Sequence, residues 1–171
     1  MRIRLSLFFI TFFSIVAFAQ NASKVNFGIK NLGITVDGYF KTFTIETNLD
    51  SNKKLISISG KVNVKSIRTG IESRDEHLLE EDYFNTNKHE FIILKSTAIN
   101  KKLDNHYLVD IDLTIKGKTK SMTIPILVTE QSENLIITSD FKINRRDFNV
   151  GGSSFVMSNT VKISVVHYQN L

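Results

Sequence analysis

The sequence predicts an all-β protein of about eight antiparallel strands with one short helix between them. Apolar and polar residues alternate with a period of two along most of the chain after residue 19, and short polar turns separate the alternating stretches. The alternation breaks only in the charged segment Thr69–Thr97, which begins with a helical pattern. Eight short amphipathic strands in one domain form either a closed barrel or a two-sheet sandwich.

The first 19 residues have the features of a secretory signal peptide. Arg2 and Arg4 precede the apolar run Leu5–Ala19, which ends in the small-x-small site Ala17-Phe18-Ala19. The run is short for a membrane span, which needs roughly 20 apolar residues. We therefore expect cleavage after Ala19, a single domain over residues 20–171, and a periplasmic or secreted protein without a stable membrane anchor.

The composition excludes several classes of protein. The chain has no cysteine, so it has neither disulfides nor a thiol for a lipid anchor. Without its first 19 residues, which hold two arginines and no acidic residue, the net charge is +3, and the basic residues are scattered. This charge does not indicate a nucleic-acid partner. A domain of this length can bury a core without cross-links.

Three strands are expected before the helix. Lys24–Asn31 alternates clearly, and Thr35–Thr47 follows it with Gly38 and Phe40 on one face. The cleanest alternation is in Leu55–Lys65, whose apolar parity consists of Ile56, Ile58, Val62 and Val64. Period two of this kind indicates a strand with one apolar face and one wet face.

A short helix is predicted over residues 74–81. Ser73 and Glu76 have the spacing of a capping box, and about two helical turns follow. Leu78 and Leu79 can face inward, and the aromatic pair Tyr83-Phe84 comes next. A helix with an apolar corner, inserted between barrel strands, is expected to close one end of the barrel.

The second half of the chain predicts five more strands. They are Phe91–Ile99, Tyr107–Ile115, Lys120–Thr129, Asn134–Ile143 and Thr160–Tyr168. Gly117 marks a turn between the second and third of these. Pro125 cannot donate to a ladder, so it predicts an edge, a bulge or a local break in pairing.

A catalytic or metal site has little support in the sequence. Arg74, Asp75 and His77 could form a charged site, but helical neighbours at i and i+2 diverge by roughly 200°, which favours structural or capping roles. The four histidines show neither i,i+4 spacing nor an HExxH pattern, and no GxSxG elbow is present. We expect no metal site and no enzyme activity.

Five short motifs, in order, resemble the YceI-like family of exported, polyisoprenoid-binding proteins over roughly Val25 to Val165. They are Arg74-Asp75-Glu76-His77-Leu78, Asp82-Tyr83-Phe84, the strand end Lys95-Ser96-Thr97, the turn from Leu113 to Lys120, and Arg145-Arg146-Asp147-Phe148. The chain departs from the family pattern at several positions. Leu94 stands where Phe is frequent, and Asn149 stands where Gly is common, although Asn tolerates a left-handed backbone.

The resemblance implies a lipocalin-like antiparallel barrel whose apolar interior holds an isoprenoid, an isoprenoid quinone or a similar amphiphile, with no enzyme activity, metal or other cofactor. Strand parity and the resemblance together predict the ligand-lining residues Phe27, Ile29, Phe40, Ile56, Ile58, Val62, Val64, Leu79, Phe84, Ile92, Leu94, Val109, Ile111, Leu113, Ile124, Ile126, Phe141, Val161 and Ile163. Leu79 and Phe84 are expected to seal the end.

Two alternatives to lipid binding remain open at the level of the sequence. An eight-stranded barrel can be filled by its own side chains, and it could then act as an envelope protein-interaction module. An enzyme using Arg74, Asp75 and His77 is the third hypothesis. The sequence does not distinguish a monomer from a homodimer.

Overall fold

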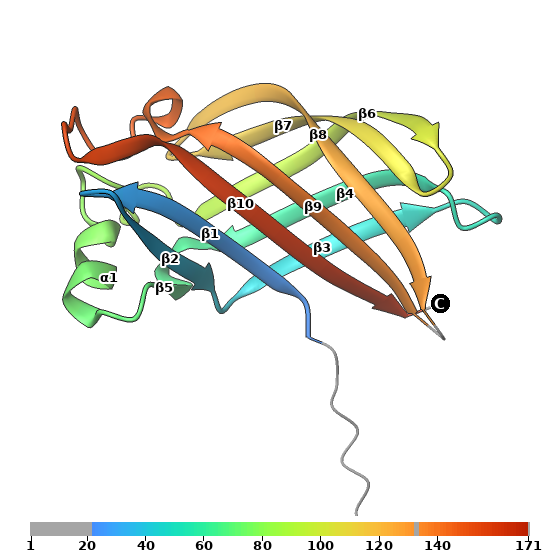
Figure 1. Ribbon diagram of the computed structural model, residues 1–171, viewed down its shortest axis with the longest axis horizontal. Helices are drawn as coiled ribbons and strands as arrows, with labels where there is room; N and C mark the ends of the chain where they lie inside the picture. Colours follow the sequence, from blue (N-terminus) through green and yellow to red (C-terminus); the bar gives the residue numbers. More distant parts are fainter. Residues whose placement is uncertain (1–21, 132–133, 171) are drawn as a thin grey trace, which may run out of the picture.

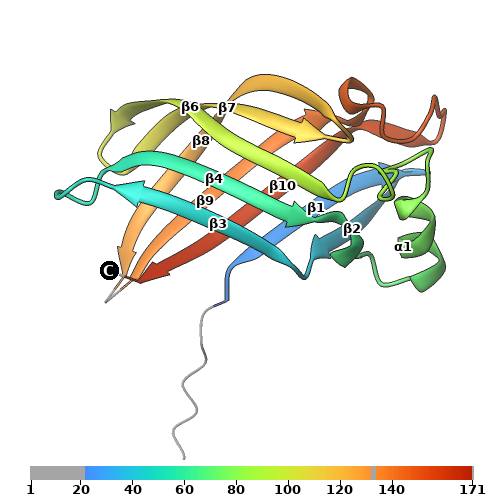
Figure 2. The ribbon, with the colours of Figure 1, turned by 180° about the vertical axis from the view of Figure 1, so that it is seen from behind.

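The computed structural model describes residues 22–131 and 134–170. The predicted signal peptide, residues 1–19, lies outside the described residues. The strands pair antiparallel throughout, in the order β3-β4-β6-β7-β8-β9-β10-β1-β2-β5, and the sheet curls around a core (Figures 1 and 2). The elements are β1 Lys24–Asn31, β2 Ile34–Phe40, β3 Phe43–Leu49, β4 Leu55–Asn63, η1 Val64–Ser66, β5 Ile67–Arg68, α1 Glu72–Leu79, β6 Phe91–Leu103, β7 His106–Ile115, β8 Lys118–Gln131, β9 Asn134–Asn144, η2 Arg145–Phe148 and β10 Met157–Asn170. In the described part of the chain, helices are too short or too polar to cross a membrane.

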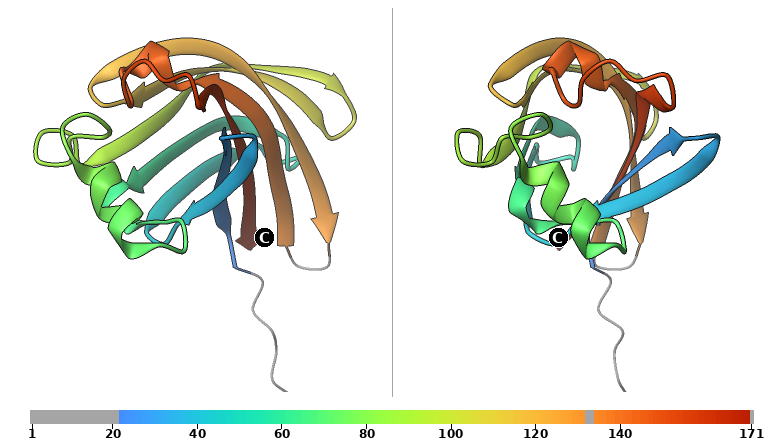
Figure 3. Two further views of the ribbon diagram at one scale, coloured as in Figure 1. Left: turned by 60° about the vertical axis from the view of Figure 1, so that its left-hand side comes forward. Right: turned by 90° about the vertical axis from the view of Figure 1, so that its left-hand side faces the viewer.

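Two sharp bends explain why ten strands are found where eight were predicted. The predicted strand 35–47 bends at Lys41-Thr42 into β2 and β3, and the chain of β4 bends through η1 into β5. The bends face each other, because the Lys41 amide donates to the Ser66 carbonyl at 3.1 Å and the Asn63 amide donates to the Thr42 carbonyl at 3.0 Å. The terminal strand β3 continues the chain of β2, and the terminal strand β5 continues the chain of β4, so each bent strand joins the two ends of the sheet order. Counting each bent strand once confirms the eight-stranded antiparallel barrel, whose curvature Figure 3 shows.

The start of β4 contradicts the predicted orientation of Ile56. The pairing of β3 with β4 shifts between Asn48 and Leu49, so that Leu49 pairs with Leu55 and Ile56 is the extra residue of a bulge. Leu55 is consequently buried, whereas Ile56 is 55% exposed on the outer face. A bulge reverses the parity on one side of it, which alternation in the sequence cannot reveal.

The turn predicted at Gly117 is confirmed, and the irregular pairing predicted at Pro125 is found in β8. Lys116 and Gly117 have φ of 50° and 71°, the left-handed pair that a tight β7–β8 hairpin requires. The ladder between β8 and β9 begins only at Leu127, two residues after Pro125. Ser139 donates its hydroxyl to the Pro125 carbonyl at 2.6 Å, and the part of β8 before Leu127 pairs with β7 alone, so the proline lies where the pairing of β8 with β9 ends.

The middle of the barrel is filled by side chains. Inward residues of β7, β8 and β9 are almost completely buried, with Val109 and Ile111 at 0% exposure. They belong to one cluster whose other deeply buried members on these strands include Tyr107, Leu113, Ile124, Ile126, Val128, Leu135 and Ile137. The open space of the barrel therefore lies elsewhere, toward α1.

Candidate functional site: an apolar cavity beneath the helix

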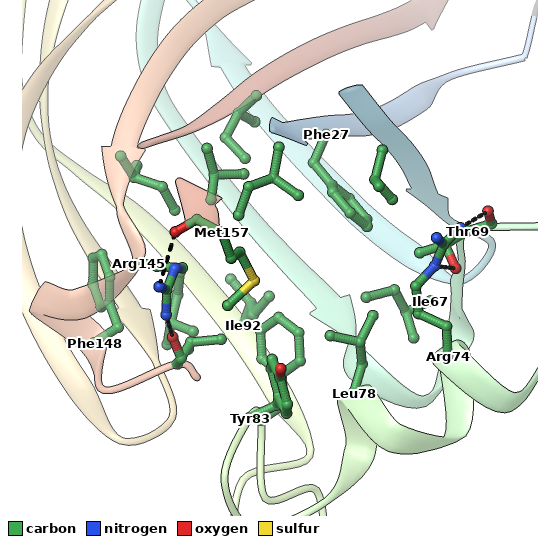
Figure 4. A pocket seen from close by; sticks show the side chains of 18 of the residues that line it. Phe27, Ile67, Thr69, Arg74, Leu78, Tyr83, Ile92, Arg145, Phe148 and Met157 are labelled. Carbon is green, nitrogen blue, oxygen red and sulfur yellow. Dashed lines mark hydrogen bonds between the residues drawn. The ribbon is translucent and has the colours of Figure 1, made fainter. Parts of the chain in front are cut away.

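A cavity of about 310 Å³ lies at one end of the barrel, and Figure 4 shows side chains that line it. The helix α1 covers this end (Figure 3). Strands β1, β2 and β10 form one side of it, α1 and the following loop form a second, and the region around η2 forms a third. Its apolar lining consists of Phe27, Ile29, Val36, Phe40, Ile67, Leu78, Tyr83, Phe84, Ile92, Ile115, Ile143, Phe148, Val150, Met157, Val161 and Ile163. Its polar lining consists of Asn31, Thr69, Arg74, His77 and Arg145.

A glycine allows Phe27 to reach the cavity. Phe27 is paired with Gly38 across β1 and β2, and its ring lies over the space that a side chain at residue 38 would fill. The ring then packs at a tilt against Phe40, with 5.5 Å between the ring centroids. The two rings form an aromatic wall at the edge of the cavity.

The helix presents Leu78 to the cavity, and the prediction that Leu79 seals it is wrong. Leu78 lines the cavity (Figure 4). Leu79 lines a separate outward groove together with Arg68 and Glu72. The helix spans Glu72–Leu79, two residues earlier than predicted, and its N-cap is Ile71 without a side-chain bond. The predicted capping box of Ser73 is therefore absent, and the faces of the helix differ from those expected.

An aspartate and a threonine fix the start of the helix instead. The Thr69 amide and hydroxyl both donate to Oδ1 of the buried Asp75, at 2.8 and 2.5 Å. Arg74 donates from Nε to the Thr69 hydroxyl at 2.8 Å and from Nη2 to the Thr69 carbonyl at 2.6 Å. His77 contacts Glu80 through Nδ1 at 2.9 Å and packs edge-on against Tyr83. Asp75 is thus held by Thr69 and lies outside the cavity lining, whereas Arg74 and His77 line the cavity.

Arg145 forms the opposite side of the cavity. It is only 3% exposed, and Nε donates to the Ser158 carbonyl at 2.9 Å. Its terminal nitrogens donate to the carbonyls of Val150, Gly151, Gly152 and Met157 and to the Asn159 side chain. Burial, reinforced by the neighbouring Arg146, lowers the pKa of Arg145 below its ordinary value. Arg145 is therefore the residue around which the loop before β10 is organised.

The predicted lining residues fall into three groups. Seven line the cavity: Phe27, Ile29, Phe40, Phe84, Ile92, Val161 and Ile163. Eight belong to the filled core or pack against it: Ile58, Leu94, Val109, Ile111, Leu113, Ile124, Ile126 and Phe141. Val64 is buried in η1, Val62 is half-buried opposite Ile92, and Ile56 and Leu79 point away from the cavity.

Sequence reasoning missed several residues of the cavity. Val36, Ile115 and Ile143 share the inward parity of their strands and could have been found from alternation. Phe148, Val150 and Met157 come from η2, the loop after it and the first residue of β10, where the sequence shows no regular period. Within residues 22–131 and 134–170, no three His, Asp or Glu side chains gather in a way that could hold a metal ion.

Comparisons with known proteins agree with the fold and with the resemblance to the YceI-like family. The model of the YceI-like domain matches residues 17–167. Protein YceI of Shigella flexneri is 30% identical over 134 residues, covering 74% of this chain and 70% of that protein. A UPF0312 protein of Staphylococcus epidermidis is 34% identical over 120 residues, covering 68% of this chain and 67% of the other.

Solved structures share the barrel. BcnA of Burkholderia cenocepacia superposes with a TM-score of 0.81 at 25% identity, covering 86% of this chain and 96% of that one. A polyisoprenoid-binding domain from Saccharophagus degradans superposes with a TM-score of 0.66 at 17% identity, covering 87% and 94%. With the family model matched over most of its length, the chain belongs to the YceI-like domain family.

Proposed function

We propose that this protein is an exported, non-catalytic carrier or store that binds the chain of a small amphiphilic lipid in the cavity beneath α1. The observation that carries the proposal is the cavity itself, an apolar space inside a barrel whose remaining interior is filled. A polyisoprenoid-binding domain with the same fold supports a lipid as the ligand.

The volume of the cavity sets the length of chain that fits. An engineered cavity of about 150 Å³ holds benzene, which corresponds to roughly 25 Å³ for each carbon. On that scale, the 310 Å³ cavity accommodates about a dozen carbons, or two to three isoprene units. Each buried methylene contributes about 0.8 kcal/mol, so affinity rises about fourfold per carbon until the cavity is full.

The filled-core alternative accounts for only part of the barrel. Val109 and Ile111 are sealed from solvent, as a solid interior requires, but the cavity lies at the α1 end of the same barrel. For the enzyme alternative, Asp75 already accepts two hydrogen bonds from Thr69, and it does not line the cavity. The observed arrangement therefore supports ligand binding more directly than catalysis.

A matched pair of helix variants tests the proposal. Leu78 and Leu79 are adjacent, half-buried leucines, and only Leu78 lines the cavity. Leu78→Gln places an amide against the bound chain, and an amide without a partner costs roughly 1–3 kcal/mol, which weakens binding about 5- to 100-fold. Leu79→Gln should leave binding within about twofold, since it changes a surface groove.

Binding is measured by titrating dodecanol against a fluorescent fatty-chain probe and, separately, by mass spectrometry of an organic extract of protein purified from its native host without detergent. Loss of probe binding in Leu78→Gln alone supports the proposal. Equal effects of both variants, or repeated native preparations without any apolar molecule, would contradict it.

A further inference from the structure

Four large apolar side chains stand exposed on two neighbouring loops at the α1 end of the barrel (Figures 1 and 3). Leu32 and Ile34 belong to the β1–β2 hairpin and are 72% and 71% exposed. Phe155 is fully exposed and Val156 is half-exposed, both in the loop that leads into β10. The Leu32 amide donates to the Val156 carbonyl at 2.9 Å, which holds the two loops side by side. These four residues are called the apolar tip below.

Neither the turn nor the packing accounts for these side chains. Leu32 and Gly33 have φ of 52° and 79°, the left-handed pair of a two-residue hairpin, at which Asn-Gly is favoured. A leucine in this backbone region is uncommon, and its exposed side chain buries little area in return. Phe155 follows Gly151-Gly152-Ser153-Ser154, and its ring packs against none of the chain. Exposed apolar groups that gather on one surface mark a contact with a partner or a membrane.

The apolar tip is continuous with the cavity. Asn31 precedes Leu32 and Met157 follows Val156, and these two neighbours pair with each other across β1 and β10. Both Asn31 and Met157 line the cavity. Whatever covers the apolar tip therefore lies directly beside the cavity lining.

The charge around the apolar tip favours an anionic partner. All 17 acidic residues of the chain lie in the segment from Asp37 to Asp147, so β1, β10 and the apolar tip carry no carboxylate. Lys30 is exposed two residues before Leu32. A lysine beside exposed apolar side chains, on strands free of carboxylates, complements the negative surface of a bilayer that contains anionic lipids.

The size of the apolar tip argues against a second protein copy as its partner. A standard protein interface involves about 20–30 residues on each side, whereas the apolar tip has four. From this arrangement we infer that the apolar tip docks on a membrane that contains anionic lipids, with its four side chains among the acyl chains and Lys30 at the head groups. The inference goes beyond the proposed function, because it assigns a surface outside the cavity and needs no ligand inside it.

The experiment measures co-sedimentation of the purified protein with vesicles. One set of vesicles contains equal parts of phosphatidylglycerol and phosphatidylcholine, and the other contains phosphatidylcholine alone. A lysine near an anionic surface strengthens binding about fivefold. The wild-type protein should therefore bind the anionic vesicles about fivefold more tightly, added salt should weaken that preference, and Lys30→Gln should remove most of it.

A matched pair of leucine variants assigns the binding to the apolar tip. Leu32→Asn should weaken binding to both sets of vesicles about tenfold, because it removes a leucine from the acyl chains. Asparagine suits the turn, so the urea midpoint should stay the same or increase, which excludes unfolding as the cause. Leu103→Asn is the control, since Leu103 is 71% exposed at the last position of β6, at the opposite end of the barrel (Figure 1). Its vesicle binding should stay within about twofold of wild type, and Phe155→Ser should behave as Leu32→Asn does.

The outcomes separate this inference from the proposed function. Vesicle binding that is weakened by Leu32→Asn and Phe155→Ser but not by Leu103→Asn supports the docking surface. A wild-type protein that binds no vesicles, equal effects of both leucine variants, or a wild-type dimer that Leu32→Asn dissociates in analytical ultracentrifugation would overturn it. Leu32→Asn should still bind dodecanol in the cavity. If no variant and no wild-type preparation binds dodecanol while vesicle binding follows the predicted pattern, only the carrier proposal fails.

Discussion

Truncating Leu113 to alanine should deepen the cavity by a predictable amount. Leu94 and Leu113 are directly paired across β6 and β7, and each is the next inward residue beyond a lining residue, Ile92 and Ile115. Neither lines the cavity and both belong to or pack against the filled core, so we infer that they form the floor between the cavity and that core. Removing three carbons opens about 75 Å³, on the scale of roughly 25 Å³ per carbon, so the longest chain that still gains affinity should lengthen by about three carbons.

The same truncation has a cost in stability that can be estimated. Leu113 is 5% exposed, and Leu→Ala changes at buried sites cost about 2–5 kcal/mol. Part of this loss should be recovered when the longer ligand fills the new space. The assay is a series of even-numbered alcohols from 8 to 20 carbons titrated against wild type and variant, with urea unfolding of each in the presence and absence of ligand. A variant whose optimal chain length is unchanged would show that Leu113 does not form the floor.

Three further predictions concern stability, and two of them involve residues that support the cavity. Arg145→Gln leaves several buried carbonyls without a donor and should cost at least about 1–3 kcal/mol in urea unfolding. Gly38→Ala places a methyl group against the Phe27 ring and within 2.8 Å of a backbone carbonyl, which should cost about 1–3 kcal/mol and weaken ligand binding. Burial lowers the pKa of His167 below 6.5, so the unfolded state takes up the proton first, and the free energy of unfolding should decrease as the pH falls through 6.5. His167→Asn should reduce that decrease, whereas an unchanged pH profile would refute it.

The sequence predicted the fold well wherever alternation ran undisturbed. The inward parities of β7 and β8 are correct at every residue named, because both strands are long and regular and each has one buried face. The predicted inward orientation of Ile56 was wrong, because a bulge shifts the register there and no local residue type signals a bulge. Alternation also ran through Lys41-Thr42 without revealing the bend that divides β2 from β3.

The site was less predictable than the fold. The helix begins two residues early because Asp75 binds Thr69, which lies before the helix, whereas Ser73 and Glu76 make no capping bond. Leu78 therefore faces the cavity as expected, whereas Leu79, which was expected to seal the end, lies in the outward groove. Met157 reaches the cavity through the loop that Arg145 organises, a contact between distant segments that no sequence period encodes.

The central claim is that the cavity beneath α1 holds an apolar chain of about a dozen carbons. The most direct measurement is the dissociation constant of the wild-type protein for the series of alcohols from 8 to 20 carbons, by calorimetry or by displacement of a fluorescent probe. The affinity should increase about fourfold for each added methylene up to about 12 carbons and then level off. An affinity that continues to increase to 20 carbons, or no binding at any length, would contradict the claim.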